Sequence, residues 1–329
     1  MVETFVETAF REKGGVMLVN GQWKSKWNPV QKKDSEGRFI RQSSSFTNGI
    51  TNVKEAVDQG LRLYVAYICP WATRTLIARS LLGLEKMIDV KVVEPQLGDF
   101  GWRFGSFLGA TQSGIEGVEF AHQLYTKTDD QYTGRATVPV LWDIRDEKII
   151  NNESAEILRI FNDDLRPIHH SAINLYPVEL REKIDAFNDS IYDSVNNGVY
   201  RAGFASSQQA YNEAITSLFN RLEELELHFQ IYDYAVDDQL TESDIRLFVT
   251  LVRFDVAYHG LFKTNLKSIA DYPALSAYLK RLLKIEAFAK NTRVDHIKSG
   301  YYSIKALNPS GIIPQGPHLD WFKYFQDGI

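Results

Sequence analysis

The stretch LRLYVAYICPWATRTLIARSLLG, residues 61–83, decides the fold that this sequence predicts. Its first part, Leu61–Ile68, has the length of a strand and is rich in β-branched and aromatic side chains. Cys69 and Pro70 follow, and apolar residues then recur at helical spacing as far as Gly83, which is a helix stop signal. A second short strand is predicted for VKVV at 90–93. This order predicts a parallel βαβ unit with Cys69 between its first strand and its helix.

Cys69 is the candidate nucleophile. Proline is well tolerated at the first position of a helix, and the free N–H groups there favour a thiolate, so we expect the pKa of this thiol to lie below about 8.5. Arg74 would add positive charge. The alternative is a buried, inert cysteine in a tight turn. Residue 72 is Ala, so no second cysteine stands at CxxC spacing. A reactive thiolate here must therefore be resolved by an external thiol, such as glutathione or a related small thiol.

The segment after the Gly-rich loop 94–136 predicts a ligand-binding turn. A strand at Val138–Asp143 and a hairpin partner at Glu147–Asn151 precede a short helix at 153–161. Pro139 enters its strand without an N–H to donate, which a cis peptide would explain, and the backbone of Val138 would then be open to a peptide-like ligand. An ordinary edge-strand proline is the alternative.

The start of the short helix at 153–161 is a second candidate binding element. Ser154 and the first N–H groups would bind a carboxylate, and Glu153 would accept from an ammonium group. An Asn-Glu-Ser helix start is otherwise a commonplace cap.

The second half of the chain predicts a helical bundle. Strand signals nearly vanish after Pro167, and helices are expected at about 178–200, 206–229, 241–258, 273–286 and 290–299. Thr241 and Asp244 have the spacing of a capping box, with Asp in place of Glu, and this is a stability signal. Residues 1–60 are interpreted as a wrapping extension and residues 301–329 as an extended closing tail.

Composition excludes several functional classes. The 329-residue chain suggests two domains, and a net charge of −5 gives no basic footprint for nucleic acid. Its apolar runs are too short to span a bilayer, and the N-terminus lacks a signal-peptide pattern, so a cytoplasmic protein is expected. A single cysteine excludes an internal disulfide and any multi-cysteine metal site, and no metal is expected.

The chain resembles the glutathione transferase superfamily, and within it the glutathionyl-hydroquinone reductases, or Xi class. The resemblance covers the chain from about residue 60 to its end. The matching stretches are CPWATRTLIARSLLGLE, GWRF, RATVPVLWD, NNESAEILRIFN, NNGVYRAGFA, LTESDIRLFVTLVRFDVAYHGLFKTN and DHIK…YY…NPSGIIPQGP. It implies a thioredoxin-like α/β domain over 61–165, an all-α helical domain over 175–300, and a homodimer. It also implies reduction of S-glutathionyl-hydroquinones by glutathione, the co-substrate.

The resemblance also implies roles for particular residues. Cys69 would take glutathione from the substrate, and its partners fall into two groups. The glutathione would be bound by Trp102, Arg103, Val138, Glu153 and Ser154. The quinol pocket would be lined by Tyr200, Tyr258 and one Tyr of the pair 301–302, with Tyr301 preferred. The family has His before this pair and Ser-His after it, whereas this chain has Gly300 and Ser303-Ile304. The choice of tyrosine and the outer wall of the pocket therefore stay open.

Three other functions were weighed. The first is an omega-like thioltransferase or dehydroascorbate reductase. The second is a conventional conjugating transferase, which a cysteine at the helix start disfavours because it would form a disulfide with bound thiol. The third is a non-catalytic interaction module on the same fold, against which the intact Cys69 and Trp102 argue.

Overall fold

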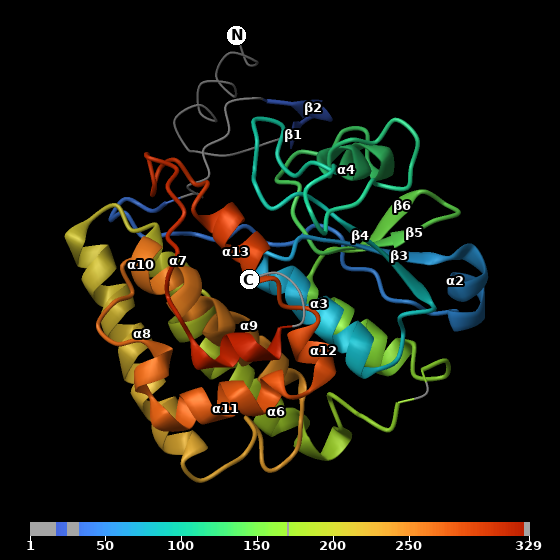
Figure 1. The fold of residues 1–329 in the computed structure, drawn as a ribbon. Helices are drawn as coiled ribbons and strands as arrows, with labels where there is room; N and C mark the ends of the chain where they lie inside the picture. Colours follow the sequence, from blue (N-terminus) through green and yellow to red (C-terminus); the bar gives the residue numbers. More distant parts are fainter. Residues whose placement is uncertain (1–17, 25–32, 170, 326–329) are drawn as a thin grey trace.

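The computed structural model describes residues 18–24, 33–169 and 171–325. Within these ranges the chain forms an α/β unit followed by a helical unit, and Figure 1 shows the sheet on one side of the molecule and the long helices on the other. This is the predicted fold class, a thioredoxin-like domain joined to an all-helical domain. No helix of the described residues is long and apolar enough to cross a membrane.

The α/β unit is built on a sheet of strand order β4-β3-β5-β6. The strands are β3 (Leu61–Val65), β4 (Ile88–Val92), β5 (Val140–Asp143) and β6 (Lys148–Asn151), and the helices are α3 (Pro70–Leu81), α4 (His122–Thr128) and α5 (Ser154–Arg159). Strand β3 pairs parallel with β4 and antiparallel with β5. The predicted βαβ unit is therefore confirmed. Strand β3 ends at Val65, earlier than expected, because a turn closed by the Cys69 N–H and the Ala66 carbonyl follows it.

The helical unit confirms the predicted helices, with shifted ends and several breaks. Its helices are α6 (Arg181–Ile191), α7 (Gly198–Gly203), α8 (Gln208–Phe229), α9 (Glu242–Arg253), α10 (His259–Leu261), α11 (Pro273–Leu283), α12 (Glu286–Ala289) and α13 (Val294–Tyr301). Wider π-helical turns extend α5, α6 and α9 over 160–164, 192–196 and 254–258, and short 3-10 turns lie at 178–180, 269–271 and 320–324. The predicted capping box of Thr241 and Asp244 is present at the start of α9.

Two elements escaped sequence analysis. Helix α2 (Val53–Gln59) lies inside the predicted extension, and α4 lies inside the predicted loop 94–136. The rest of the extension is mostly irregular from residue 33 onward, with Phe39 and Ile50 in the main hydrophobic core. A small ribbon of β1 (Leu18–Val19) and β2 (Gln22–Trp23) precedes it. Other residues of the predicted extension, 1–17 and 25–32, and the tail end 326–329 lie outside the described residues.

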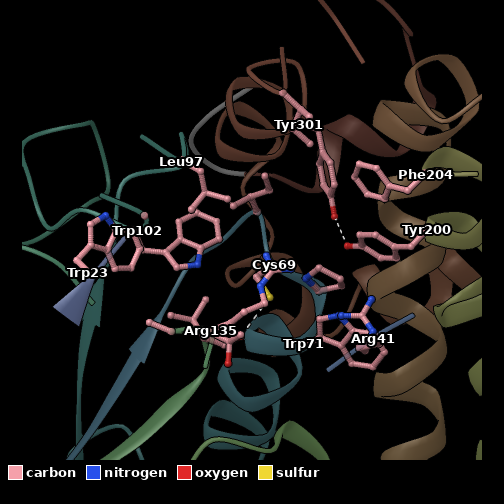
Figure 2. Close-up of a pocket in the computed structure, with 17 residues that line it drawn as sticks. Trp23, Arg41, Cys69, Trp71, Leu97, Trp102, Arg135, Tyr200, Phe204 and Tyr301 are labelled. Atoms are coloured by element: carbon pink, nitrogen blue, oxygen red, sulfur yellow. Dashed lines mark hydrogen bonds between the residues drawn. The ribbon is translucent and has the colours of Figure 1, made fainter. Parts of the chain in front are cut away.

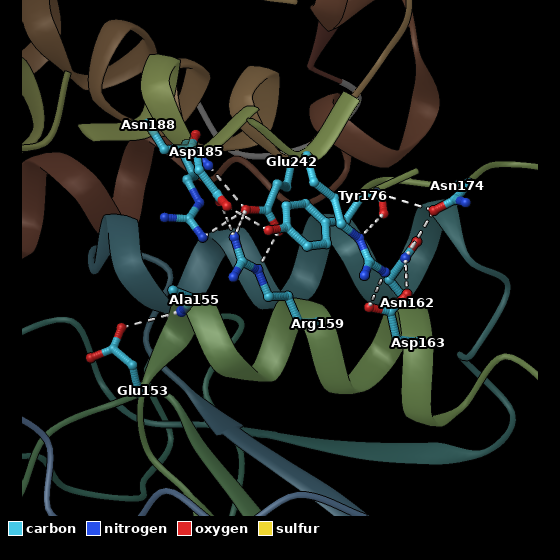
Figure 3. A network of polar contacts seen from close by, with 12 residues as sticks. Glu153, Ala155, Arg159, Asn162, Asp163, Asn174, Tyr176, Asp185, Asn188 and Glu242 are labelled. Carbon is cyan, nitrogen blue, oxygen red and sulfur yellow. Dashed lines mark hydrogen bonds and ion pairs between the residues drawn. The ribbon is translucent and has the colours of Figure 1, made fainter. Parts of the chain in front are cut away.

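A polar network joins the two units near the start of α9 (Figure 3). The carboxylate of Glu242 is 1% exposed and accepts from Arg159 of α5 at 3.1 Å and from Arg246 at 2.8 Å. Asn188 of α6 donates to the same carboxylate at 3.0 Å. Because a buried carboxylate needs charged partners, this contact ties α5 to the helical unit in one arrangement. The cleft described next lies between the same two units.

Candidate active site

Cys69 stands at the bottom of a cleft between the α/β and helical units. It is the N-cap residue of α3, and its side chain makes no capping hydrogen bond. Figure 2 shows Trp102, Trp23 and Arg135 to one side of Cys69, and Tyr301, Tyr200, Phe204, Trp71 and Arg41 to the other. Cys69 is half-buried as a residue and lines the cleft.

The predicted cis peptide is present between Val138 and Pro139. The Val138 carbonyl lies beside the start of α3, where the Cys69 thiol donates to it with an Sγ to oxygen distance of 3.5 Å. Val138 lines the cleft together with Ala136 and Thr137. A run of backbone at the wall of a cleft is suited to pairing with the backbone of a peptide-like ligand.

The expected depression of the thiol pKa is not found. Burial raises the pKa of Cys69 above its ordinary value, and the N–H groups of Ala72 and Trp71 and the guanidinium groups of Arg253 and Arg41 oppose this rise without cancelling it. The partial exposure gives access from the cleft, but the surrounding protein removes most of the water that would stabilise a thiolate. The expected low pKa rested on the N–H groups at the start of the helix and did not include the desolvation of the sulfur.

The positive charge expected from Arg74 matters less to the pKa of Cys69 than that of two other arginines. Arg74 is buried beneath the site, where its guanidinium lies 4.3 Å from the Trp71 ring and donates to Asn196 at 3.0 Å. Burial lowers the pKa of Arg74 to about 9. The cations that act on the thiol are instead Arg41, from the N-terminal extension, and Arg253, from the end of α9.

Arg253 holds the turn that presents Cys69. Its side chain is fully buried and donates from Nε to the Ile68 carbonyl at 2.9 Å and from Nη2 to the Tyr67 carbonyl at 2.8 Å. A third bond, 2.7 Å long, reaches the hydroxyl of Thr73 in the first turn of α3. Sequence analysis gave Arg253 no role, because 184 residues separate it from the cysteine along the chain and only the fold brings them together.

The three predicted tyrosines meet on the helical side of the cleft. The hydroxyl of Tyr301 lies 2.5 Å from that of Tyr200 and 2.9 Å from that of Tyr258. Tyr301 and Tyr200 line the cleft, whereas Tyr258 is fully buried behind them and does not line it, contrary to the expectation. The structure also decides between the paired tyrosines, because the Tyr302 hydroxyl lies beside Gly260 instead of in this cluster.

Burial keeps all three hydroxyls in their protonated form. It is the largest cause that raises the pKa of Tyr200, and it raises the pKa of Tyr258 and Tyr301 well above the ordinary value. A neutral hydroxyl in a hydrogen-bonded chain donates one proton and accepts another. The cluster is thus suited to giving a hydrogen bond, or a proton, to an oxygen bound in the cleft.

Gly300 and Ile304 shape the outer part of the tyrosine side. A Cβ on Gly300 would stand 2.5 Å from the Pro95 carbonyl oxygen and 2.2 Å from Ile68, so only glycine lets α13 approach this closely. Ile304 lines the cleft with an apolar side chain. Of the two positions where this chain departs from the family pattern, Ile304 lies in the cleft lining, and Gly300 packs behind it against Ile68, which lines the cleft.

Not all of the predicted glutathione ligands lie in the cleft. Trp102 and Val138 line it, whereas Arg103 is exposed and does not. Arg103 belongs to a bridge with Phe120 that turns its side chain out to solvent. Arg135 lines the cleft instead and was missed, although it stands directly before the Ala-Thr-Val-Pro segment.

Glu153 and Ser154 lie at the start of α5, as predicted, but outside the cleft lining. Glu153 accepts from the Ala155 N–H at 3.2 Å and from the hydroxyl of Ser44, in the N-terminal extension, at 2.8 Å. Ser154 is buried. A capping carboxylate already engaged in this way leaves fewer lone pairs for a ligand ammonium than the sequence suggested.

Two family models match the chain, described as the N-terminal domain of glutathione S-transferase over residues 68–164 and its C-terminal domain over residues 208–281. The glutathionyl-hydroquinone reductase PcpF of Sphingobium chlorophenolicum is 44% identical over 302 residues, which cover 92% of this chain and 96% of the relative. The chain belongs to the Xi-class glutathione transferases. This confirms the family to which the sequence was assigned.

Solved structures of the Xi class share the fold. The glutathione transferase Xi of Phanerochaete chrysosporium superposes with a TM-score of 0.84 at 45% identity, covering 87% of this chain and 95% of the other. The glutathione-bound structure of YqjG from Escherichia coli K-12 gives a TM-score of 0.81 at 41% identity, covering 93% of this chain and 97% of the other.

Among the described residues, no three His, Cys, Asp or Glu side chains group in a way that could hold a metal ion.

Proposed function

We propose that this Xi-class protein is a glutathionyl-hydroquinone reductase, which uses glutathione to remove the glutathionyl group from S-glutathionyl-hydroquinones. The observation that carries the proposal is a single cleft with three parts. It holds Cys69, the backbone beside a cis Val138-Pro139 bond, and the Tyr200–Tyr301 hydroxyl pair. Glutathione and an aromatic alcohol would bind on opposite sides of one sulfur.

The glutathione part of the substrate would bind on the Trp102 side. The Val138 backbone would pair with the backbone of glutathione, and Trp102 and Arg135 would flank it. The γ-glutamyl end would extend toward Glu153 and Ser154 at the start of α5, with Arg103 playing no direct part. The hydroquinone ring would then lie against Tyr200 and Tyr301, with Tyr258 positioning Tyr301 from behind.

The reaction balances in two steps, attack of Cys69 on the thioether and then attack of glutathione on the resulting mixed disulfide. The sulfur of Cys69 attacks the glutathione sulfur, an S–S bond forms, and the C–S bond to the ring breaks. The ring carbon that carried the sulfur gains a proton, and the ring leaves as the free hydroquinone. A second glutathione then attacks the mixed disulfide, which releases glutathione disulfide and restores the Cys69 thiol.

The raised pKa of Cys69 fits this proton balance. The thiol loses one proton in the first step and the ring carbon gains one. A thiol that stays protonated until the substrate is bound keeps that proton within the site. The neutral tyrosine hydroxyls would assist the shift of a ring-hydroxyl proton to the ring carbon, which makes a keto tautomer from which the ring is a far better leaving group. The proton released by the thiol would then neutralise the ring oxygen after the C–S bond has broken.

Mass spectrometry after mixing with S-glutathionyl-menadiol tests the proposal. We expect one glutathione on Cys69 and one equivalent of menadiol released. The Cys69→Ala variant should bind glutathione, lose at least about a thousandfold in turnover, as expected when a covalent nucleophile is removed, and keep its thermal stability. Full activity of this variant would refute the proposal. If the protein were instead a conjugating transferase, the Cys69→Ser variant would gain the ability to conjugate glutathione to an aryl halide.

The proposal includes a homodimer in the cytoplasm. Glutathione and its reduced pool are characteristic of that compartment, where a lone reactive thiol persists in its reduced form. Sedimentation of the purified chain tests the dimer, with a single species of twice the chain mass as the expected result.

A further inference from the structure

Arg41 reaches the cleft from the N-terminal extension, a part of the chain to which sequence analysis gave no function. Two contacts anchor the surrounding segment: Arg38 pairs with Glu213 of α8 at 2.8 Å, and Thr47 bridges to Asn151 of β6. Between these anchors, the Nε of Arg41 donates to the Asn197 side chain at 2.7 Å. The guanidinium is thereby held at the wall of the cleft that contains Cys69 (Figure 2).

The surroundings of this guanidinium are aromatic. Its central carbon lies 4.5 Å from the ring centroid of Trp71 and 5.0 Å from that of Tyr200. Its Nη2 atom is buried and has no hydrogen-bond partner in the part of the chain that the structure describes. No ion pair of the described residues includes Arg41. A charged donor without an acceptor is costly, and half-buried Arg41 lines the cleft, so a ligand oxygen in the cleft would supply the acceptor that its Nη2 atom lacks.

The ring-release step creates an acceptor on this side of the cleft. In the keto tautomer of the substrate, one ring hydroxyl has lost its proton and the carbon bonded to sulfur has gained one. When the Cys69 sulfur takes the glutathionyl group, the electron pair of the broken C–S bond restores the aromatic ring. The negative charge of that pair then resides on the ring oxygen, so the departing hydroquinone leaves as a phenolate.

We propose that Arg41 binds this ring oxygen and stabilises the phenolate as the C–S bond breaks. This inference rests on the proposed reductase activity. The tyrosine hydroxyls supply neutral donors to the same ring, and Arg41 supplies the charge. Arg135 lies on the opposite side of Cys69, next to the Val138 segment, and is the better placed cation for a carboxylate of glutathione.

A comparison of two reactions of the full-length enzyme tests the role of Arg41. The first substrate is S-glutathionyl-menadiol, which releases a ring. The second is the mixed disulfide of glutathione and 2-mercaptoethanol, which needs Cys69 but releases no phenolate. The variants are Arg41→Met, Arg41→Lys and, as a matched control at an arginine that does not line the cleft, Arg281→Met, with circular dichroism to confirm folding.

We expect Arg41→Met to lower kcat/KM for the menadiol substrate by about 10- to 100-fold, the range for loss of a hydrogen bond to a charged group. Its disulfide reaction should fall by no more than a few-fold, and Arg41→Lys should recover part of the menadiol activity. The defect should shrink with a glutathionyl-chlorohydroquinone, whose phenolate is intrinsically more stable. Arg281→Met should leave the ratio of the two reactions unchanged.

Two results would overturn the inference while leaving the reductase activity in place. Equal losses in both reactions would mean that Arg41 acts on the Cys69 thiol alone. No loss in either reaction would mean that it has no role in turnover. Failure of the proposed function is a separate result, because the wild-type enzyme would then release no menadiol.

Discussion

Helix α9 begins at a capping box, whereas helix α3 begins at a cysteine whose side chain caps nothing. At α9 the carboxylate of Asp244 accepts from the Thr241 and Ala235 N–H groups, each at 2.8 Å, and from the hydroxyl of Tyr278 at 2.9 Å. At α3 the N–H groups of Trp71 and Ala72 instead act on the sulfur of Cys69. The start of α9 is closed by reciprocal hydrogen bonds that add stability, whereas the first donors of α3 face the candidate nucleophile.

The two starts share one electrostatic property. Burial raises the pKa of Asp244 to about 6 and raises that of Cys69, although each group sits where a helix favours negative charge. Desolvation therefore outweighs the helix start at both places. The last turn of α9 also joins them, because Arg253 bonds the backbone that leads into Cys69.

Removal of the Arg253 side chain, which links α9 to the backbone before Cys69, should have the largest effect on stability and turnover. Arg253→Met leaves the buried carbonyls of Tyr67 and Ile68 without their donor, and we expect a loss of about 3 kcal/mol in the free energy of unfolding, since each unsatisfied group costs about 1–3 kcal/mol. Turnover should fall at least about tenfold, because a small displacement of a reacting group is costly. Urea denaturation and menadiol release measure the two effects. Arg281→Met, which breaks only a partly exposed pair with Asp233, should cost less than about 1 kcal/mol. Similar losses of unfolding free energy in the two variants would contradict the role of Arg253 in holding the turn before Cys69.

Two capping boxes of different burial sharpen the stability side of the comparison. Asp244→Ala removes a fully buried carboxylate with four donors, and we expect a loss of about 2–4 kcal/mol. Asp271→Ala removes the same motif with Ser268 at an exposed site, where about 1 kcal/mol is typical. Thermal and urea unfolding measure both losses. Neither variant should change kcat per folded molecule, so a selective loss of kcat in Asp244→Ala would place α9 in the chemistry.

The smallest expected effect concerns the charge of the thiol. Alkylation of Cys69 by iodoacetamide should show a midpoint above about 8.5, the ordinary thiol pKa, because burial disfavours the thiolate. The folded protein then holds this proton more tightly than the unfolded chain does. Stability should therefore fall as pH rises above the ordinary pKa, and Cys69→Ser should lack that fall. Cys69 is the only cysteine, so alkylation has no background. A midpoint near pH 7 would show that the N–H groups at the start of α3 lower the thiol pKa by more than burial raises it.

The local features of the site were predictable from the sequence. The strand–Cys–Pro–helix order, the cis Val138-Pro139 bond and the capping box at Thr241 each depend on neighbours a few residues apart. Helices α2 and α4 were missed because they are short segments inside stretches rich in polar residues and glycine. Arg103 and Arg135 were misjudged because periodicity does not tell which way a loop side chain turns.

By itself the sequence determined which atom is the candidate nucleophile and which local elements surround it, because backbone sterics and helix-start chemistry act over a few residues. Only the tertiary structure decided the rest. It brought Arg41, Arg253 and the three tyrosines to Cys69 from distant parts of the chain, and it desolvated the sulfur enough to reverse the expected direction of its pKa. Charge and solvation depend on everything packed within several ångströms, and that neighbourhood does not exist until the chain has folded.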